Sequence, residues 1–419
     1  MVTMFTRTHK DIKSVFRKTT KNRKKMKRRK KRGMIALIGI LFVVIQFLAS
    51  VLFLKNLILL DILPLKYLMM VVLFLVFILC YNFTSQYTKA HIVGKILAIV
   101  LSVVLVFGYT ASDKIKNTLD SISDSLFLNQ ENAGNQRVIK KDESFIVYLS
   151  GNDEYGKITE HGKSDVNILA TINPKTKQIL LVSTPRDYYI TISGFDESGN
   201  LITGLDKFTH AGNAGIQYSI EALENLYGID VDYFFKINFD GCINIVDAMG
   251  GITIYSDVEF TNGTNAAPEQ YNFVEGANQC DGAKTLAFVR ERECFTKGDI
   301  QRGINQEAAI TAMLDKVISP SILLKYAEIL DAVSNMLLTN MPVEAITGLV
   351  KEQINNPKEW NVQSYALDYI KEESGTKLCN VYGGYRWVAI PDYNMVNNAI
   401  EMINRTKSGE IFDVNEYIK

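Results

Sequence analysis

The sequence predicts an α/β protein in which three N-terminal transmembrane helices precede an extracytoplasmic domain with layered α-β-α architecture and a central mixed sheet. Two observations support this fold class. Three apolar runs, at residues 34–54, 67–81 and 92–109, follow a strongly basic N-terminal arm. From residue 144 onward, short apolar segments of strand length alternate with longer segments of helical periodicity, which is typical of a sheet covered by helices.

The apolar runs match the thickness of a bilayer core, which takes about 20 helical residues. The first and third runs have this length, and the second has it once the apolar residues back to Leu57 are included. A cleaved signal peptide is the alternative for the first run. That run begins only at Met34, however, and two more runs follow it, so we favour a membrane anchor.

The distribution of charge predicts the orientation in the membrane. The arm at 1–33 carries 15 Lys or Arg and a single acid, Asp11, and such arms stay in the cytoplasm. The basic loop at 84–95 follows an even number of crossings and agrees. Residues from 111 onward, with 27 basic against 43 acidic side chains, therefore lie outside. Contact of residues 24–32 with nucleic acid is the alternative, but beside a span a lipid surface fits better, so no nucleic-acid partner is expected.

The chain divides into four expected parts. They are a basic cytoplasmic arm that is expected to be disordered (1–33), three membrane helices (34–110), a polar linker (111–143) and the extracytoplasmic domain (144–419), with its core at 144–320 and a helical and strand extension at 321–419. Strands are expected at 145–149, 166–172, 178–183, 233–237, 252–255 and 387–390. Helices are expected at 214–227, 240–249, 281–288, 299–318, 320–337, 342–350 and 396–403.

Four of the five cysteines, Cys242, Cys280, Cys294 and Cys379, would face the oxidising outer side, whereas Cys80 lies in a span. A pairing of Cys280 with Cys294, or of one of these with Cys379, is plausible, and four free thiols are equally plausible. The sequence has no Cys-x-x-Cys pair or Cys/His cluster, so neither a zinc site nor a catalytic cysteine is expected.

Arg186 is the first candidate for binding a phosphate. Pro185 favours an extended conformation at Thr184, so Arg186 and Asp187 are expected just beyond the end of a buried strand, where α/β sheets commonly bind ligands. Arginine presents a planar fork of N–H groups that matches phosphate oxygens. A local surface pair of Arg186 with Asp187 is the alternative.

Three further arginines lie in two neighbouring motifs. Arg290 and Arg292 are two residues apart, a spacing that points both the same way only on an extended chain, so a helix would have to end before Arg290 if both served one site. Arg302 and Gln306 share one face of an expected helix with Asp299. A solvated charge cluster and an ordinary wet helix face are the alternatives for these two motifs.

Asp153 and Asp165 are candidates for a metal site. Asp153 follows the first expected strand and Asp165 precedes the second, so adjacent strands could bring both carboxylates to one end of the sheet. Mg²⁺ prefers one or two carboxylates together with phosphate oxygens and water. Either residue could instead be an ordinary loop carboxylate. Lys207 and His210 are weaker candidates, for a phosphate contact and for a structural hydrogen bond.

Two common catalytic motifs do not occur in the sequence. There is no Gly-x-x-x-x-Gly-Lys-Ser/Thr loop, which disfavours a nucleotide-triphosphate motor. There is no Gly-x-Ser-x-Gly elbow either, which disfavours a serine hydrolase of that type. The combination of arginines and carboxylates indicates metal-assisted chemistry on a phosphate or pyrophosphate.

Several motifs together closely resemble the LytR-CpsA-Psr family, over about 145–320. They are Ser-Asp-Val-Asn-Ile-Leu (164–169), Asn-Pro-Lys-Thr (173–176), Ser-Thr-Pro-Arg-Asp (183–187), Lys-Phe-Thr-His-Ala (207–211), Gly-Gly-Ile (250–252), Phe-Val-Arg-Glu-Arg (288–292) and Gly-Asp-Ile-Gln-Arg-Gly-Ile-Asn-Gln (298–306). The three spans ahead of them resemble the capsule-associated members. Many members carry a second basic residue just after the position of Arg302, where this chain has Ile304 and Asn305.

The resemblance implies a membrane-anchored transferase of a Gram-positive-type cell envelope. Such an enzyme moves an anionic glycan, teichoic acid or capsular polysaccharide, from a polyprenyl-pyrophosphate carrier to peptidoglycan through a phosphodiester link. The resemblance implies that Asp153 and Asp165 bind Mg²⁺, or Mn²⁺ in its place. It also implies that Asp165 takes part in catalysis. It implies that the pyrophosphate is bound by a catalytic set of four arginines, which are Arg186, Arg290, Arg292 and Arg302. Two further contacts with the pyrophosphate come from Lys207 and Gln306.

Two other functions stay open at this point. With water as the acceptor, the protein would be a pyrophosphatase acting on the polyprenyl-pyrophosphate carrier. A non-enzymatic transcriptional attenuator or lipid-binding scaffold that uses the basic arm is the second. The sequence identifies neither the glycan nor which of Asp153 and Asp165 would be the base.

Overall fold

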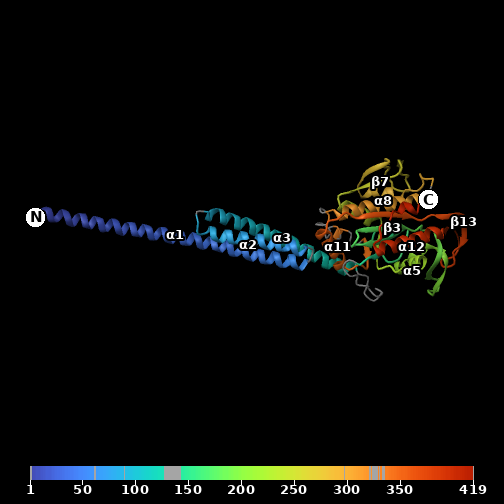
Figure 1. Cartoon of the computed structure of the whole chain (residues 1–419), viewed down its shortest axis with the longest axis horizontal. Helices are drawn as coiled ribbons and strands as arrows, with labels where there is room; N and C mark the ends of the chain where they lie inside the picture. The colour runs from blue at the N-terminus through green and yellow to red at the C-terminus, as the bar shows by residue number, and fades with distance from the viewer. Residues whose placement is uncertain are drawn as a thin grey trace. The chain divides into compact units, whose positions relative to one another are not determined.

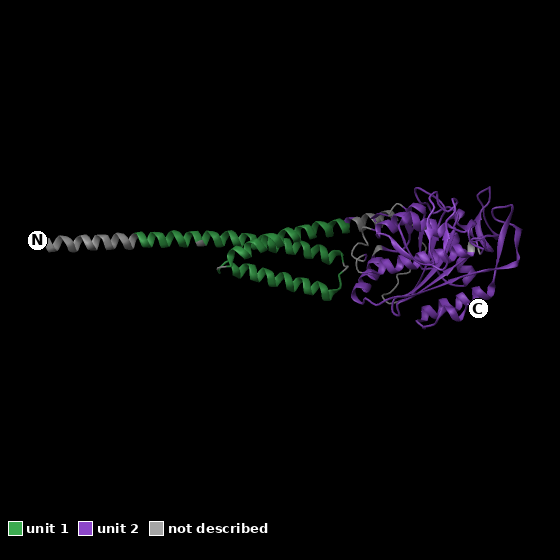
Figure 2. Ribbon diagram, turned by 90° about the horizontal axis from the view of Figure 1, so that it is seen from above, with its two compact units in different colours: residues 1–116 green, residues 117–419 purple. Residues whose placement is uncertain are grey.

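The computed structural model describes residues 2–60, 63–88, 90–126, 143–296, 298–319, 322, 329, 331–332 and 336–418. The chain forms two compact units, Met1–Lys116 and Asn117–Lys419 (Figure 2). Each unit has apolar side chains packed in its interior.

The first unit is a bundle of three helices, which are α1 (Val2–Leu60), α2 (Leu65–Ser85) and the greater part of α3 (His91–Leu126). The segments that are long and apolar enough to cross a membrane are Thr20–Leu60, Leu65–Ser85 and His91–Asn117. A hydrogen bond of 2.7 Å from Asn82 Nδ2 to Gln46 Oε1 joins α2 to α1, as polar side chains between helices in apolar surroundings commonly do. The three expected apolar spans are therefore all helical.

Two segments that were expected to lack regular structure are helical. The linker expected at 111–143 is helical up to Leu126, because Ile115, Leu119 and Ile122 precede Leu126 at helical spacing and no Gly or Pro interrupts them. The basic arm, expected to be disordered, belongs to α1 from Val2 onward, since Lys and Arg are good helix formers. The rest of the expected linker, 127–142, lies outside the described residues.

The second unit is built around a six-stranded mixed sheet with the strand order β11-β6-β1-β2-β3-β12. Its strands are β1 (Phe145–Gly151), β2 (Val166–Asn173), β3 (Gln178–Ser183), β6 (Tyr233–Ile237), β11 (Leu337–Thr339) and β12 (Asn361–Ala366). β1 runs parallel to β6, and β12 runs parallel to β3, while the other neighbours are antiparallel. The predicted mixed central sheet is confirmed.

Helices cover both faces of this sheet, so the domain has three layers (Figure 1). Ile146 of β1 packs in a cluster with α5 (Ile216–Tyr227) and α12 (Tyr393–Ser408). The next residue, Val147, packs in a cluster with α8 (Asp299–Ile318) and α11 (Val343–Asn355). Successive side chains of a strand point to opposite faces, and every residue of β3 is buried, as expected for a strand that is covered on both sides.

The remaining elements lie around the sheet and its loops. Two-stranded sheets are formed by β4 (Tyr189–Phe195) with β5 (Leu201–Lys207), β7 (Ile252–Ser256) with β10 (Gly276–Cys280), β8 (Phe260–Thr261) with β9 (Asn272–Phe273), and β13 (Tyr369–Leu378) with β14 (Tyr385–Pro391). The other described helices include α4 (Phe208–Ala214), α6 (Phe239–Ala248), α7 (Gly282–Arg290) and the 3-10 helix Val414–Glu416.

Most expected elements lie close to their predicted bounds, and β3, β6 and α8 have the bounds that were predicted. The helix expected at 214–227 is α5, which begins at Ile216 because Gly215 precedes it with φ of 137°, a conformation that suits glycine. The short helix α4, which ends before Gly215, was not predicted. Most of the helix expected at 320–337 lies outside the described residues. The C-terminal part of the chain reaches both edges of the central sheet, through β11 and β12.

Candidate functional site

The candidate residues gather along the side of the central sheet where β1, β3 and β6 end and β2 begins. We call this side the sheet edge; it is distinct from the edge strands β11 and β12. β1 and β6 end at this edge and β2 begins there, since Gly151 is paired with both Val166 and Ile237. The loop between β1 and β2 leaves and returns at the same place, because Asp165 N donates to Gly151 O at 2.8 Å. This loop carries Asp153 and Asp165 at the same end of the sheet, as predicted.

Arg186 follows β3 at this edge and forms an ion pair with Asp165. Its Nη1 lies 2.7 Å from Asp165 Oδ1, whereas its Nε lies 4.0 Å from Asp187 Oδ2. Arg186 therefore lies nearer to Asp165, which is far from it in sequence, than to its neighbour Asp187. This argues against a merely local pair with Asp187. Asp187 pairs instead with Lys207 Nζ. All four side chains are only partly exposed, so their charges interact more strongly than they would in bulk water.

Arg290 projects from α7 toward the other end of the same loop. Its Nη2 lies 3.5 Å from Asp153 Oδ1, and its Nη1 donates to Ala266 O at 2.9 Å. Its Cζ lies 4.2 Å from the centre of the Phe239 ring. A carboxylate, a carbonyl and an aromatic ring therefore hold the guanidinium from three sides.

The charged segment at the end of α7 is only partly a solvated cluster, since Arg292 and Glu293 are exposed whereas Glu291 is buried. α7 runs through Arg290 instead of ending before it, because the chain becomes extended only at Glu291. The Glu291 side chain is buried, and its carboxylate accepts hydrogen bonds from four backbone N–H groups, those of Arg292, Glu293, Cys294 and Gly263. Burial opposes the charged form, but these hydrogen bonds outweigh it and lower the pKa of Glu291. The carboxylate thereby shapes the turn that presents the exposed Arg292.

α8 packs against the end of α7 through two side-chain amides. The last turn of a helix leaves its carbonyls without partners inside the helix. Here Asn305 Nδ2 donates to Phe288 O at 3.3 Å, and Gln306 Nε2 donates to Val289 O at 3.4 Å. The amide of Gln306 therefore serves to join the two helices, while Arg302 lies half-buried one turn earlier on α8.

A buried carboxyl, Glu307, lies behind this face of α8. It is 3% exposed and hydrogen-bonds with Ser364 and with the backbone of Ser183, the last residue of β3. Burial dominates over these hydrogen bonds and raises the pKa of Glu307 to about 8, so the group is largely protonated at neutral pH. The side chain of Asp299, which was predicted to share a face with Arg302, lies outside the described residues.

The two carboxylates of the β1–β2 loop offer oxygen atoms of the kind that Mg²⁺ binds. Each uses Oδ1 for its arginine, and within the described part of the chain no protein donor bonds to Oδ2 of Asp153 or Asp165. Asp153 is 53% exposed and Asp165 is 14% exposed, so a ligand can reach both. Hard carboxylate oxygens beside arginines suit Mg²⁺ or Mn²⁺ bound together with phosphate oxygens.

A second cluster combines residue types that bind metals. Ligand atoms of Asp206, His210 and Cys379 lie within 4.8 Å of one another. His210 Nδ1 lies 2.7 Å from Asp206 Oδ1, so His210 makes the structural hydrogen bond that was expected. The sequence hides this cluster because Cys379 lies far along the chain. All five cysteines are free thiols, as in the alternative without disulfides.

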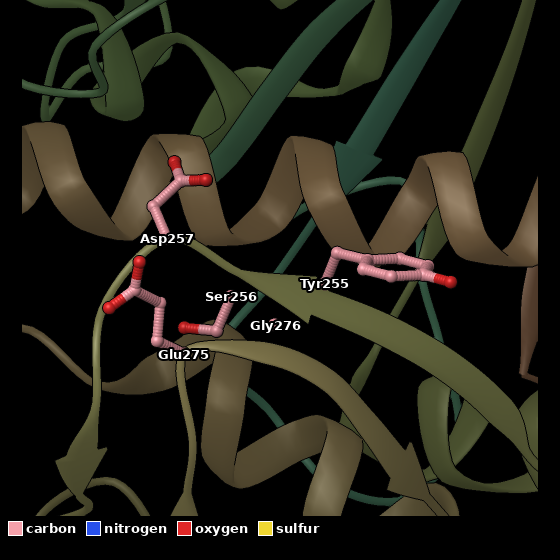
Figure 3. A pocket seen from close by; sticks show the side chains of 5 residues that line it. All are labelled: Tyr255, Ser256, Asp257, Glu275 and Gly276. Carbon is pink, nitrogen blue, oxygen red and sulfur yellow. The ribbon is translucent and has the colours of Figure 1, made fainter.

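A concavity on the described surface lies elsewhere, on the β7–β10 sheet, and none of the predicted site residues lines it. It has a volume of about 550 Å³ and is lined by Tyr255, Ser256, Asp257, Glu275 and Gly276. The carboxylates of Asp257 and Glu275 lie at one end of it and the Tyr255 ring at the other (Figure 3). Two carboxylates without a basic partner in the lining would repel a diphosphate, so this concavity does not suit that ligand.

A comparison of the sequence with known protein families identifies the family of this protein. The model of the LytR_cpsA_psr family matches residues 102–387 of this chain. The protein belongs to the LytR-CpsA-Psr family. That assignment agrees with the motifs that contain Arg186, Arg290 and Arg302.

Two curated relatives and one solved structure show the similarity. The chain is 30% identical over 247 residues to the Bacillus anthracis protein "Polyisoprenyl-teichoic acid--peptidoglycan teichoic acid transferase TagU", covering 59% of this chain and 77% of the relative. A Bacillus subtilis (strain 168) protein of the same name is 30% identical over 284 residues, which are 66% of this chain and 83% of the relative. The crystal structure of a Streptococcus agalactiae protein shares the fold, with a TM-score of 0.53 and 26% identity over 66% of this chain and 94% of that one.

Three residues at this LytR-CpsA-Psr site were not singled out from the sequence. Asp187 holds Lys207, Glu291 shapes the turn before Arg292, and Phe239 lies against the Arg290 guanidinium. Asp187 and Glu291 were considered only as members of local charge clusters. For Phe239 the available signal was its place at the first position of a helix that directly follows a strand, where side chains reach the ligand edge of a sheet.

Proposed function

We propose that this chain transfers an anionic cell-wall glycan, teichoic acid or capsular polysaccharide, from a polyprenyl-pyrophosphate carrier to peptidoglycan. Membership of the LytR-CpsA-Psr family and the names of its relatives support the proposal. The observation that carries it is the pairing of two arginines with the two carboxylates of one loop at a sheet edge. This arrangement offers cations to a diphosphate and oxygen ligands to a metal ion.

The basic side chains bind and orient the diphosphate. They come from separate segments: Arg186 after β3, Lys207 at the end of β5, Arg290 and Arg292 at the end of α7, and Arg302 on α8. Ion pairs with Asp165 and Asp153 orient Arg186 and Arg290 before the substrate binds. Phosphoryl transfer depends mainly on such positioning and on stabilisation of developing charge.

The transfer step exchanges one oxygen on the glycan-side phosphorus for another. A peptidoglycan hydroxyl oxygen forms a bond to this phosphorus, and the bond from the phosphorus to the bridging oxygen breaks. Polyprenyl phosphate leaves with the electron pair, and the arginines stabilise its charge. The hydroxyl proton passes to Asp165 or Asp153, each of which keeps one oxygen free of its arginine.

Asp153 and Asp165 would also be the residues that hold Mg²⁺ or Mn²⁺. The bound ion would supply positive charge beside the diphosphate. Their donor chemistry supports this assignment, since Oδ2 of each carboxylate has no protein donor among the described residues.

The location that we propose is the cell membrane, with the N-terminus in the cytoplasm and the catalytic domain outside. Three apolar helices support an anchor, and the 15 basic residues of the arm support its orientation. An anchor in the same bilayer as a polyprenyl-linked substrate raises the effective concentration of that substrate at the site.

A reconstituted reaction tests the proposal. The full-length protein in lipid vesicles is incubated with a defined polyprenyl-pyrophosphate-linked glycan, peptidoglycan fragments and Mg²⁺, and wall-linked and free glycan are both quantified. We expect wall-linked product that disappears with a metal chelator and returns with Mg²⁺ or Mn²⁺. We expect replacement of Arg290 by Ala to lower the rate by about 100-fold or more, the effect of losing one electrostatic group from a transition state.

Arg405→Ala is the matched control for this experiment. Arg405 is 21% exposed, against 24% for Arg290, and it also contacts a carboxylate and lies over an aromatic ring. It belongs to α12 and does not contact the candidate site residues. Free glycan without wall-linked product would identify a pyrophosphatase instead, and substrate binding without any product would identify a scaffold.

A further inference from the structure

The ring of Phe239 lies between Arg290 and the β1–β2 loop that carries Asp153. The ring lies 4.2 Å from the Arg290 guanidinium carbon and 5.1 Å, edge to face, from the Tyr155 ring. Tyr155 belongs to the β1–β2 loop, two residues after Asp153, the carboxylate that pairs with Arg290. Phe239 therefore contacts both the arginine and the loop that carries its partner.

Local hydrogen bonds fix the backbone that carries this ring. Phe239 is the first residue of α6, and its N–H donates to Glu154 O at 3.1 Å. On one side of it, Asn238 Nδ2 donates to Gly156 O at 2.6 Å, and on the other, Asp240 Oδ2 accepts from Gly156 N at 2.7 Å. The start of α6 and residues 154–156 thus form one hydrogen-bonded junction, which fixes the position of the Phe239 backbone.

The contacts of the ring are those of an orienting group and not of a core residue. Phe239 is only half-buried, whereas Phe208, Phe273 and Phe288 are fully buried. An aromatic face attracts a guanidinium through its quadrupole. Because the ring covers one face of the Arg290 guanidinium while Ala266 O and Asp153 hold its Nη atoms, rotation about the arginine side chain is restricted.

We infer that Phe239 is a positioning residue, which holds the Arg290 guanidinium in the orientation that binds a diphosphate. The ring acts through Arg290 and does not touch the reacting atoms. This inference rests on the proposed function for its biological meaning, but it concerns diphosphate binding, which can be measured without transfer.

Binding of inorganic pyrophosphate tests the inference. Its affinity for the full-length protein, in detergent micelles with Mg²⁺, is measured by calorimetry for the wild type, Phe239→Leu and Phe239→Trp. Leucine keeps the apolar volume but removes the aromatic face, so we expect affinity to fall about tenfold, the size of one partly desolvated cation–π contact. Tryptophan keeps an aromatic face, and we expect affinity within about threefold of the wild type.

Arg290→Gln, which removes the cation, shows whether the effect passes through Arg290. If it does, adding Phe239→Leu to Arg290→Gln should change affinity by less than about twofold, because coupled residues have non-additive effects. Phe412→Leu is the control for loss of a phenylalanine under an arginine, since Arg405 Cζ lies 4.8 Å from that ring. It should lower the melting temperature and leave pyrophosphate affinity unchanged.

The outcomes separate this inference from the proposed function. Wild-type affinity in Phe239→Leu, an equal tenfold loss in the Arg290→Gln background, or a wild type that does not bind pyrophosphate would each overturn the role of Phe239. Tight pyrophosphate binding by a wild type that forms no wall-linked product would overturn the proposed function and leave the role of Phe239 standing. Where transfer is active, kcat should fall in Phe239→Leu while KM for the acceptor stays the same.

Discussion

Two carboxylate clusters of the second unit have similar residue types and different hydrogen bonding. At the sheet edge, Asp165 and Asp153 each give one oxygen to an arginine and keep the other free of protein donors within the described residues. In the cluster with His210 and Cys379, both oxygens of the buried Asp206 accept two hydrogen bonds each, Oδ1 from His210 Nδ1 and Lys207 N, and Oδ2 from Val381 N and Tyr382 N.

The difference shows that proximity of ligand types does not by itself make a metal site. A carboxylate offers about four lone-pair positions, and Asp206 uses all four on the protein. Burial opposes its charge, but the hydrogen bonds from His210, Tyr382, Cys379 and Lys207 outweigh burial and lower its pKa to about 2. We therefore infer that Asp206 fastens β5 to the β13–β14 connection, and Asp153 and Asp165 stay the proposed metal ligands.

Replacing aspartate by asparagine in each cluster would separate the proposed catalytic role of Asp165 from the structural role of Asp206. Asp165→Asn keeps the size of the side chain and removes its charge, so we expect transfer to fall by about 1,000-fold, or about 4 kcal/mol of transition-state stabilisation. Its stability should stay within about 1 kcal/mol of the wild type, since the asparagine Oδ1 can still accept a hydrogen bond from Arg186. The assays are transfer kinetics and denaturant unfolding. A variant with normal transfer would break the comparison.

Glu307 adds a third kind of carboxyl, one that is buried and neutral. Its pKa is raised from 4.5 to about 8, so its contribution to stability is complete below pH 4.5 and is lost as the pH rises through 8. We expect the unfolding free energy of the wild type to fall by roughly 3 kcal/mol between pH 5 and pH 8 on account of this group. Glu307→Gln is neutral at every pH and should remove that part of the decline.

Thermal unfolding at several pH values from 5 to 9 measures this difference. The curves of melting temperature against pH should converge at pH 5 and diverge toward pH 8, with Glu307→Gln the more stable at the alkaline end. Parallel curves would mean that Glu307 is already ionised in the folded protein.

Asp206→Asn should have the smallest effect on transfer and should act on stability instead. The folded pKa of about 2 lies below the ordinary 3.8, so ionised Asp206 stabilises the fold by about 2 kcal/mol above pH 4, and this is lost as the pH falls through 2. Asparagine removes the charge and leaves buried N–H groups without an acceptor. Chemical unfolding at pH 7 measures the loss. Reduced transfer per folded molecule, with normal stability, would move Asp206 into the active site.

Local patterns predicted most helices of the second unit and the strands β1, β2, β3, β6, β7 and β14, but they missed the other strands of the small two-stranded sheets. β3, β6 and α8 have the bounds that their apolar spacing and flanking residues predicted, and Asp281 caps α7 as expected. The two edge strands could not be predicted in their places, because β11 and β12 join the sheet through pairing with residues far away in sequence. Loop and arm segments were misjudged as irregular where charged and polar residues with high helix propensity continue a helix.

The site was predictable in its residue types but not in its connections. Arg186 and Asp165 were both candidates, yet their 2.7 Å contact depends on the antiparallel register of β2 with β3. Glu291 accepts hydrogen bonds from backbone N–H groups, and Phe239 presents an aromatic face to Arg290. Neither contact produces a recognisable motif in a single sequence. Such supporting contacts depend on tertiary packing, which spacing along the chain does not encode.

The parallel pairing of β12 with β3 aligns Asn361 with Gln178 and has a consequence for how the protein is made. Synthesis proceeds from the N-terminus, so β3 keeps an open edge until the last part of the chain arrives. An open strand edge invites pairing with other chains. A copy cut short before residue 361 would therefore carry every arginine of the site on an unfinished sheet that is prone to aggregate, and only full-length chains would complete the scaffold.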